Sequence, residues 1–265
     1  MMGPLAVRAT LLAIVVLCGC RFEPNPGGNN SGDGGGSGSD GQPPGDTIDP
    51  DAPPIDAFVF PCDPTACASV NGACAPSGKC VIDVDGNTKF TCPAGLYCAV
   101  TCDNANDTCA GGVDCGDAIG CDIRCGASNN NDTCQNGLVE CPTIGPCNVT
   151  CEGDHACRNF GVACGAGRCE VHCIGTDACQ DGGIRCNDST ECIAECTGAN
   201  ACQNGGVGCG VTGSCTVQCD GTSACANETC TGAPTTCTFN CCGSGACGAT
   251  SPPCGGTCTE TNNGC

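Results

Sequence analysis

Cysteine is the residue type with the most chemistry to offer in this chain, because 38 of its 265 residues are cysteine. Cysteine side chains form disulfides or bind metal ions. The C-x-x-C spacing typical of zinc ribbons and iron–sulfur ligands occurs nowhere, and the chain has only two histidines. The spacing that recurs is C-x-x-x-C. The sequence therefore predicts disulfides, and we expect neither a metal site nor a cofactor.

The C-x-x-x-C element belongs to a repeat of 22 to 26 residues. After it come Gly-x-x-Ala-Cys and an aliphatic residue two positions before another cysteine, as at Gly175–Cys179 and Ile184–Cys186. Such a period is typical of a solenoid, in which similar coils stack on one another, and we expect about seven coils. The cysteines assigned to structural disulfides, with no pairing specified, are Cys98, Cys102, Cys121, Cys125, Cys147, Cys151, Cys157, Cys164, Cys169, Cys173, Cys179, Cys186, Cys192, Cys196, Cys202, Cys209, Cys215, Cys219 and Cys225.

The residues within C-x-x-x-C predict strands. The central position is apolar in each of these elements, as at Val100 and Val217, whereas the two flanking positions are mostly polar. Positions i, i+2 and i+4 of a strand share one face, so both cysteines and the central residue should point inward. The expected fold is an all-β, disulfide-rich, right-handed parallel β-solenoid with an N-terminal cap and no helical domain.

Strand geometry reduces the number of possible disulfide pairings but does not select one of them. Cysteines at i and i+4 of one strand lie about 13 Å apart, beyond the ~4.4–6.8 Å between the Cα atoms of a disulfide. Equivalent cysteines in adjacent coils would be ~4.8 Å apart, and pairs across a turn or across the thin core are also feasible. The core offers few large apolar side chains, so disulfides worth roughly 2–4 kcal/mol each must supply much of the stability.

The first residues are typical of an export signal. Arg8 supplies a positive charge, and Ala9–Leu17 is an apolar run too short to cross a bilayer. The sequence Leu17-Cys18-Gly19-Cys20 follows directly. It resembles the lipobox of bacterial lipoproteins, which implies that residues 1–19 are a signal peptide and that Cys20 carries the lipid.

Three further segments follow the signal. Residues 20–61 are rich in Gly, Pro and Asp, so we expect a disordered tether. Residues 62–97 have other cysteine spacings, and we interpret them as a cysteine-rich cap in which Val81–Phe90 forms a hairpin that turns at Asp85-Gly86. Residues 98–265 form the repeat solenoid.

Groups suited to catalysis are sparse. His155 and His172 fall in successive coils, but no nucleophile with a supporting acid accompanies them, and we expect both imidazoles to be solvated. The stretch Asp83–Asn87 has the spaced carboxylates of a calcium loop without the distal glutamate of an EF-hand, so a turn is the favoured interpretation. The net charge of −20 argues against nucleic acid as a partner.

The repeat resembles tandem cysteine-rich repeats in extracellular lipoproteins of Gram-negative bacteria, a group usually without assigned activity. The resemblance implies export to the cell envelope, at the outer membrane or cell surface, with the lipid as the membrane attachment. Our hypothesis is a non-catalytic structural or interaction protein, adhesin-like or spacer-like, with a protein or polysaccharide partner.

Two alternatives stay open. One is a carbohydrate-active β-helix enzyme or a surface carbohydrate-binding protein, which a groove with converging Arg and Asp/Glu side chains would favour. A uniformly polar rod would favour the spacer or adhesin. The other alternative is a series of small independent disulfide knots, which limited proteolysis would separate.

Overall fold

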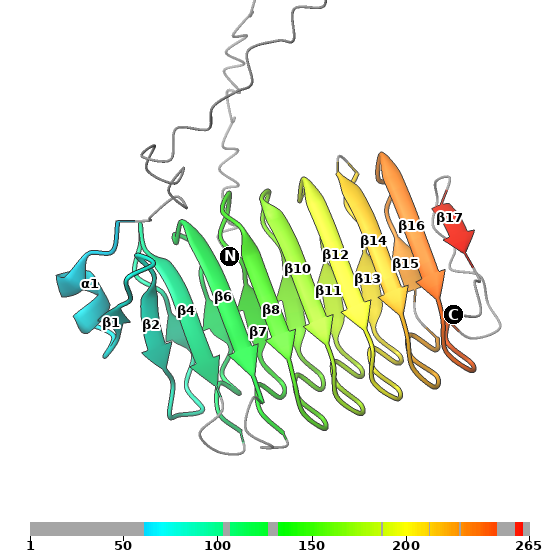
Figure 1. Ribbon diagram of the computed structural model, residues 1–265, viewed down its shortest axis with the longest axis horizontal. Helices are drawn as coiled ribbons and strands as arrows, with labels where there is room; N and C mark the ends of the chain where they lie inside the picture. Colours follow the sequence, from blue (N-terminus) through cyan, green and yellow to red (C-terminus); the bar gives the residue numbers. More distant parts are fainter. Residues whose placement is uncertain are drawn as a thin grey trace, which may run out of the picture. The chain divides into compact units, whose positions relative to one another are not determined.

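The computed structural model describes residues 61–102, 107–126, 132–186, 188–211, 213–227, 229–247 and 258–261. Residues 1–60, which include Cys20 and nearly all of the expected tether, lie outside these ranges. The described residues form an all-β solenoid with two sheets (Figure 1). The expected fold class is therefore confirmed.

Each coil contributes one long strand to a ten-stranded sheet, in which all pairs but one are parallel. The strands follow the order of the sequence, so each coil stacks on the one before it (Figure 1). The two-residue strand β1 (Ala73–Cys74) of the cap forms one edge of this sheet. The strands of the coils are β2 (Cys80–Asp83), β4 (Tyr97–Cys102), β6 (Gly120–Cys125), β8 (Cys147–Cys151), β10 (Arg168–Cys173), β12 (Glu191–Cys196), β14 (Ser214–Cys219), β16 (Thr236–Cys241) and β17 (Cys258–Thr261).

A second, seven-stranded sheet contains one short strand from each coil. Its members are β3 (Phe90–Thr91), β5 (Val113–Asp114), β7 (Leu138–Glu140), β9 (Gly161–Ala163), β11 (Gly183–Arg185), β13 (Gly206–Gly208) and β15 (Thr229–Thr231). The chain alternates between the two sheets along a right-handed path (Figure 1). Because both sheets run continuously through the coils, the alternative of independent disulfide knots is wrong.

The alternation within C-x-x-x-C has the predicted effect on burial. In β10 the side chains of Cys169, Val171 and Cys173 are buried, and those of Glu170 and His172 between them are only partly covered. The same inward column contains Val149 and Val217, both fully buried. The core between the two sheets is thus a thin stack of cysteine and aliphatic side chains, with Phe160 and Phe239 as its buried phenylalanines among the described residues.

Each of the strands β8, β10, β12, β14 and β16 leads to a first corner that holds Gly-x-x-Ala-Cys. The glycines of this motif stack directly on one another: a Cβ at Gly175 would lie 1.9 Å from the carbonyl oxygen of Gly153. In the corner after β8, His155, Cys157 and Asn159 have φ angles of 60°, 58° and 53°. This left-handed conformation turns the chain sharply, and Asn or Asp tolerates it better than most residues.

The disulfides are local, and each of β4, β6, β8, β10, β12 and β14 carries one at either end. In β10, Cys169 bonds back to Cys164 and Cys173 bonds forward to Cys179, with Cα–Cα distances of 5.9 and 6.0 Å. None of the bridges among the described residues joins equivalent cysteines of adjacent coils, so pairing across a turn is the network that forms. The coil bridges are 92–98, 102–109, 115–121, 125–134, 141–147, 151–157, 164–169, 173–179, 186–192, 196–202, 209–215, 219–225 and 241–247.

The solenoid begins earlier than we expected, and the predicted hairpin at Val81–Phe90 is wrong. Strand β2 pairs in parallel with β4, and β3 pairs with β5, so this stretch is itself a coil. Stacking on the next coil buries Ile82 to 2% exposure, which an isolated hairpin would leave open to solvent. The antiparallel pair is instead β1 with β2.

The cap itself is short. Helix α1 (Pro64–Ala68) has Asp63 as its N-cap, whose Oδ1 accepts a hydrogen bond from the backbone N–H of Thr65 at 2.8 Å. The Cys62–Cys74 bridge closes the cap on β1, and the Cys67–Cys80 bridge attaches α1 to β2 of the first coil. Within the described residues, no helix has the length and apolar character needed to cross a membrane.

Candidate functional site

The predicted site residues divide into two groups. Cys20, the expected lipid-attachment residue, lies outside the described residues, whereas each cysteine that we assigned to a structural disulfide takes part in a coil bridge. Some sulfur atoms of neighbouring coils come close together, and those of Cys102, Cys125 and Cys134 lie within 4.8 Å of one another. All three are disulfide-bonded, so none is the thiolate that a metal ion such as zinc requires.

The outer face of the long-strand sheet contains a shallow groove across β4, β6 and β8. Its volume is about 280 Å³, and it is open to solvent along its length. Hydrogen-bond donors and acceptors line it, together with one cation and one carboxylate. The polar lining residues are Thr101, Asp122, Arg124, Asn148 and Thr150. The groove contains one Arg and one Asp side chain, the residue types that the carbohydrate alternative called for.

The charged groups of the groove are already engaged with other protein groups. The guanidinium of Arg124 donates to Oε2 of Glu152 from Nη2 at 2.6 Å and from Nε at 3.2 Å. The carboxylate of Asp122 accepts from Nζ of Lys79 at 2.5 Å and from the hydroxyl of Tyr97 at 2.9 Å. A ligand in the groove would have to share or displace these partners.

Lys79, Tyr97 and Asp122 form a cluster beside the groove. The sequence analysis did not identify Tyr97 as part of any site. Its ring lies across the next coil, where a Cβ at Gly120 would come within 2.3 Å of the ring carbon Cε2. Lys79 Nζ stands 4.4 Å from the ring centroid. Burial, followed by the Asp122 carboxylate, raises the pKa of Tyr97 well above its ordinary value. The hydroxyl therefore stays protonated and acts as a hydrogen-bond donor; it is not a general base.

The two histidines lie in different parts of the solenoid and contact different carboxylates. His172 lies on the outer face of β10, with Nδ1 at 2.8 Å from Oε2 of Glu195 and Nε2 at 3.6 Å from Oε2 of Glu170. His155 lies in a first corner, and its Nε2 is 3.2 Å from Oδ2 of Asp177. We expected solvated imidazoles, and each instead lies beside carboxylates of neighbouring coils.

Polar side chains in the first corners form hydrogen-bonded columns along the solenoid. Nδ2 of Asn227 donates to Oδ1 of Asn204 at 3.0 Å, and Nδ2 of Asn204 donates to Oδ1 of Asp181 at 3.1 Å. A second column joins Asn200 to Asp177 at 3.0 Å. These side chains bond to their equivalents one coil away, so they are part of the stacking itself.

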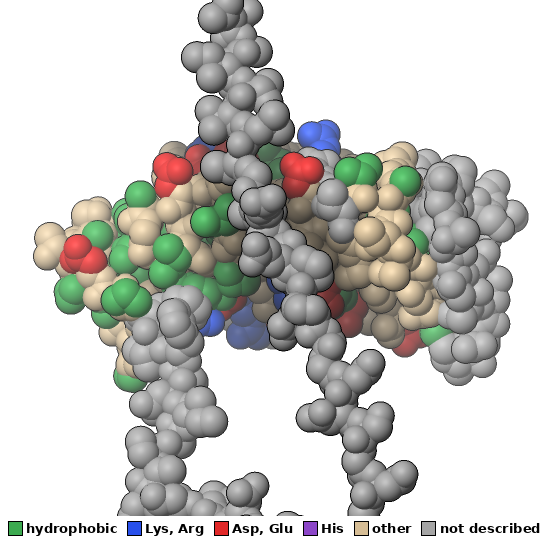
Figure 2. Space-filling view, turned by 90° about the horizontal axis from the view of Figure 1, so that it is seen from above, with side chains coloured by type: hydrophobic (Ala, Val, Ile, Leu, Met, Phe, Trp, Pro, Cys, Tyr) green, Lys and Arg blue, Asp and Glu red, His purple; other side chains and the backbone are tan. Residues whose placement is uncertain are grey.

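The second corner, which joins each short strand to the next long strand, has a different character. Between the corners that precede β6 and β8 lies an open hollow of about 590 Å³. Ala118, Ile119, Ile144 and Pro146 supply its apolar lining, and Ile144 is 80% exposed. Figure 2 views the molecule from this side, and apolar side chains are prominent there among scattered charges.

Comparisons with protein-family models, with curated proteins and with solved structures find no match for this chain. The assignment of a role therefore depends on the residues and the geometry given above.

Proposed function

We propose that this chain is a lipid-anchored protein of the bacterial cell envelope whose solenoid serves as a structural or interaction module, a spacer or adhesin, and has no catalytic role. Cys20 would hold the chain to the membrane, residues 20–61 would separate the solenoid from the lipid, and the coils would form a stiff, negatively charged rod. The tether, treated as a coil, has an end-to-end distance of roughly 35 Å.

The observation that carries this proposal is that outward-facing Lys and Arg side chains form ion pairs with carboxylates of the same chain. Lys79, Lys89, Arg124 and Arg168 each contact a carboxylate of another coil. Groups that would have to converge on a substrate are thereby paired with one another along the rod. Exposed ion pairs of this kind contribute little stability each, roughly 0–1 kcal/mol. They engage four of the six Lys and Arg side chains among the described residues.

The anchor is tested by mass spectrometry of the mature N-terminus after export in a Gram-negative host. We expect Cys20 as the first residue, carrying a lipid, and partition of the protein into a detergent phase. Cys20→Ser should abolish both the lipid modification and the detergent partition. Cys18→Ser, two residues earlier in the same motif, should leave both unchanged. A mature N-terminus at an unmodified residue would overturn the proposal.

One observation favours the carbohydrate alternative, namely the groove with Asp122 and Arg124. A panel of soluble polysaccharides distinguishes the two functions. The proposed function predicts no cleavage and, for any saccharide that binds, equal binding by the wild type and by Asp122→Asn. Cleavage or binding that Asp122→Asn loses, and that Asp220→Asn on the exposed end of another coil keeps, would establish the alternative.

A further inference from the structure

The cap bridge Cys62–Cys74 differs from the other described bridges in its exposure. Cys74 is solvent-exposed and Cys62 is half-buried. In every other bridge of which both cysteines are described, both are buried and none is more than 8% exposed. Cys242, which is also disulfide-bonded, is half-buried. Attack on a disulfide requires access of a thiolate to sulfur. Among the bridges of which both cysteines are described, the cap bridge is therefore the one that a thiol from solvent can reach while the fold is intact.

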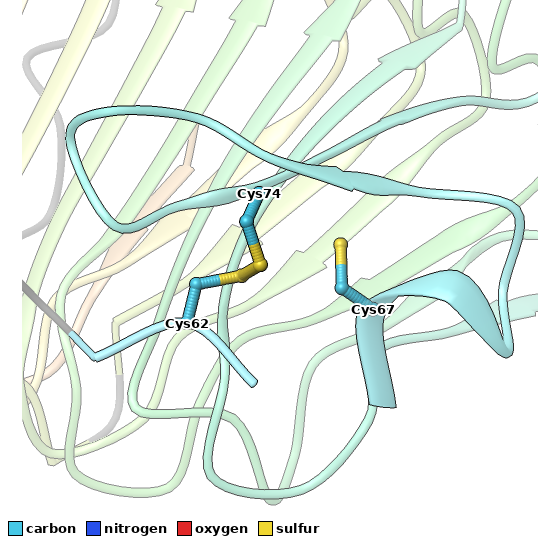
Figure 3. Close-up of side chains that lie close together, drawn as sticks. All are labelled: Cys62, Cys67 and Cys74. Atoms are coloured by element: carbon cyan, nitrogen blue, oxygen red, sulfur yellow. A yellow bond between two sulfur atoms is a disulfide. The ribbon is translucent and has the colours of Figure 1, made fainter. Parts of the chain in front are cut away.

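A second bridge lies directly behind the first. Figure 3 shows the side chain of Cys67 beside the Cys62–Cys74 bridge, and the sulfur atoms of these three cysteines are all within 4.8 Å of one another. Cys67 is itself bonded to Cys80. Cys67 and Cys80 are both 0% exposed. A thiol in solvent cannot reach the Cys67–Cys80 bridge, but a thiolate formed at Cys62 would already be next to it.

We propose that Cys62–Cys74 is a thiol–disulfide exchange site for a low-molecular-weight thiol, and that Cys67 receives the second step. The thiolate of the small molecule attacks Sγ of Cys74. The Cys62–Cys74 bond breaks, its electron pair leaves on Sγ of Cys62, and a mixed disulfide remains on Cys74. The Cys62 thiolate then attacks Sγ of Cys67, which forms Cys62–Cys67 and releases Cys80 as a thiolate that takes up a proton. Each step exchanges one S–S bond for another, so no external oxidant or reductant is consumed.

The geometry also gives the second step a consequence for the solenoid. Cys80 begins β2 and stands in register with Cys98 of β4. Parallel strands are ~4.8 Å apart, so the released Cys80 thiol lies one strand spacing from the Cys92–Cys98 bridge. Exchange at the cap is thus passed from the solvent-exposed bridge to the buried edge of the first coil.

The experiment uses the full chain in its oxidised state with glutathione as the probe. Samples taken over time are quenched with acid, alkylated and digested without reduction, and the peptides are identified by mass spectrometry. We expect a glutathione adduct on Cys74, a Cys62–Cys67 cross-link and an alkylated Cys80 to appear together, before any coil cysteine reacts. Adducts that appear first on coil cysteines, or a Cys74 adduct with no Cys62–Cys67 cross-link, would overturn the proposal.

Paired variants separate the two steps. In Cys67→Ser/Cys80→Ser the second bridge is missing, so Cys62 should accumulate as an alkylated free thiol beside the Cys74 adduct. In Cys62→Ser/Cys74→Ser, alkylation of Cys80 should fall at least about ten-fold. The matched control Cys173→Ser/Cys179→Ser removes a buried coil bridge and should leave the rate at Cys74 unchanged. Equal labelling of Cys80 with and without the cap bridge would contradict the relay, and the wild-type time course decides the question if a variant does not fold.

Discussion

Asn204 donates a hydrogen bond from Nδ2 to Oδ1 of Asp181 at 3.1 Å, and the two residues occupy the same left-handed position in successive first corners. Their φ angles are 56° for both. The side chain of Asn204 also accepts from Asn227 at 3.0 Å. One residue thus meets two requirements of the stack, since its backbone makes the turn and its side chain bonds to both neighbouring coils.

Substitution of Asn204 separates these two requirements. Asn204→Gly keeps the left-handed backbone and loses the side-chain bonds, so we expect a loss of about 1 kcal/mol. Asn204→Val also forces a β-branched residue to a positive φ, and we expect a further loss of about 1–2 kcal/mol. Thermal unfolding followed by circular dichroism, without reductant, measures both. Equal melting temperatures for the two variants would contradict the backbone argument.

The glycine column of the first corners predicts a severe effect of a single methyl group. A Cβ at Gly198 would lie 1.9 Å from the carbonyl oxygen of Gly175, so Gly198→Ala must push two coils apart. We expect a loss of about 3 kcal/mol or more and new protease cleavage near this corner. Gly86→Ala is the control, because its nearest neighbour would be 3.9 Å away. A melting temperature for Gly198→Ala that equals that of the control would show that the stack adapts.

The local pairing predicts the products of digestion without reduction. Cross-linked peptides should contain cysteines of one coil, such as Cys196 with Cys202. A Cys196–Cys219 peptide would contradict the structure, since these residues are equivalent positions of adjacent coils. Because each bridge closes a short loop, Cys196→Ser/Cys202→Ser should cost roughly 2–3 kcal/mol in thermal unfolding.

The repeat predicts that one whole coil can be removed. Cys173 and Cys196 occupy the same register position in β10 and β12, so deletion of residues 174–196 joins the chain in register. We expect a folded solenoid in which Cys173 bonds to Cys202. Circular dichroism and a peptide map without reduction test this result. Deletion of only residues 174–185, which breaks the register, should give a protein that unfolds at a much lower temperature.

Asp114 predicts a dependence of stability on acid. The backbone N–H of Gly116, at 3.0 Å, and the ammonium of Lys89 hold the pKa of Asp114 below its ordinary value. A lowered pKa means that the unfolded chain takes up the proton more readily, so this stabilisation is present above the ordinary aspartate pKa and is lost as the pH falls through the lowered one. The melting temperature of the wild type should therefore exceed that of Asp114→Asn near neutral pH, and the two should converge in strong acid. A constant difference would contradict this.

The strand pattern could be predicted because it depends on local alternation. Cys169, Val171 and Cys173 share a face in any extended chain, and the period of the repeat implies stacked coils. The stretch Val81–Phe90 misled the same reasoning, since Asp85-Gly86 is a good hairpin turn. The edge of β4 offers β2 a partner and buries Ile82, and nothing local to the segment indicates this.

The cluster around Tyr97 could not be predicted from the sequence either. Tyr97 is the one tyrosine of the chain, and no spacing links it to Lys79 or Asp122. Their contact depends on three different strands or turns that stack in one order, and on Gly120 leaving room for the ring. A glycine in place of a side chain at one coil position was the only sign in the sequence.

The amino-acid sequence by itself determined the inward and outward faces of the strands, the coil repeat and the dependence on disulfides, because these follow from the chemistry of neighbouring residues. It left the pairing of the cysteines open, since both a partner in the next coil and a partner across a turn lie within bonding distance. The tertiary structure decided it: the left-handed first corner brings Cys179 back to within 6.0 Å of Cys173, so the bridge closes inside its own coil.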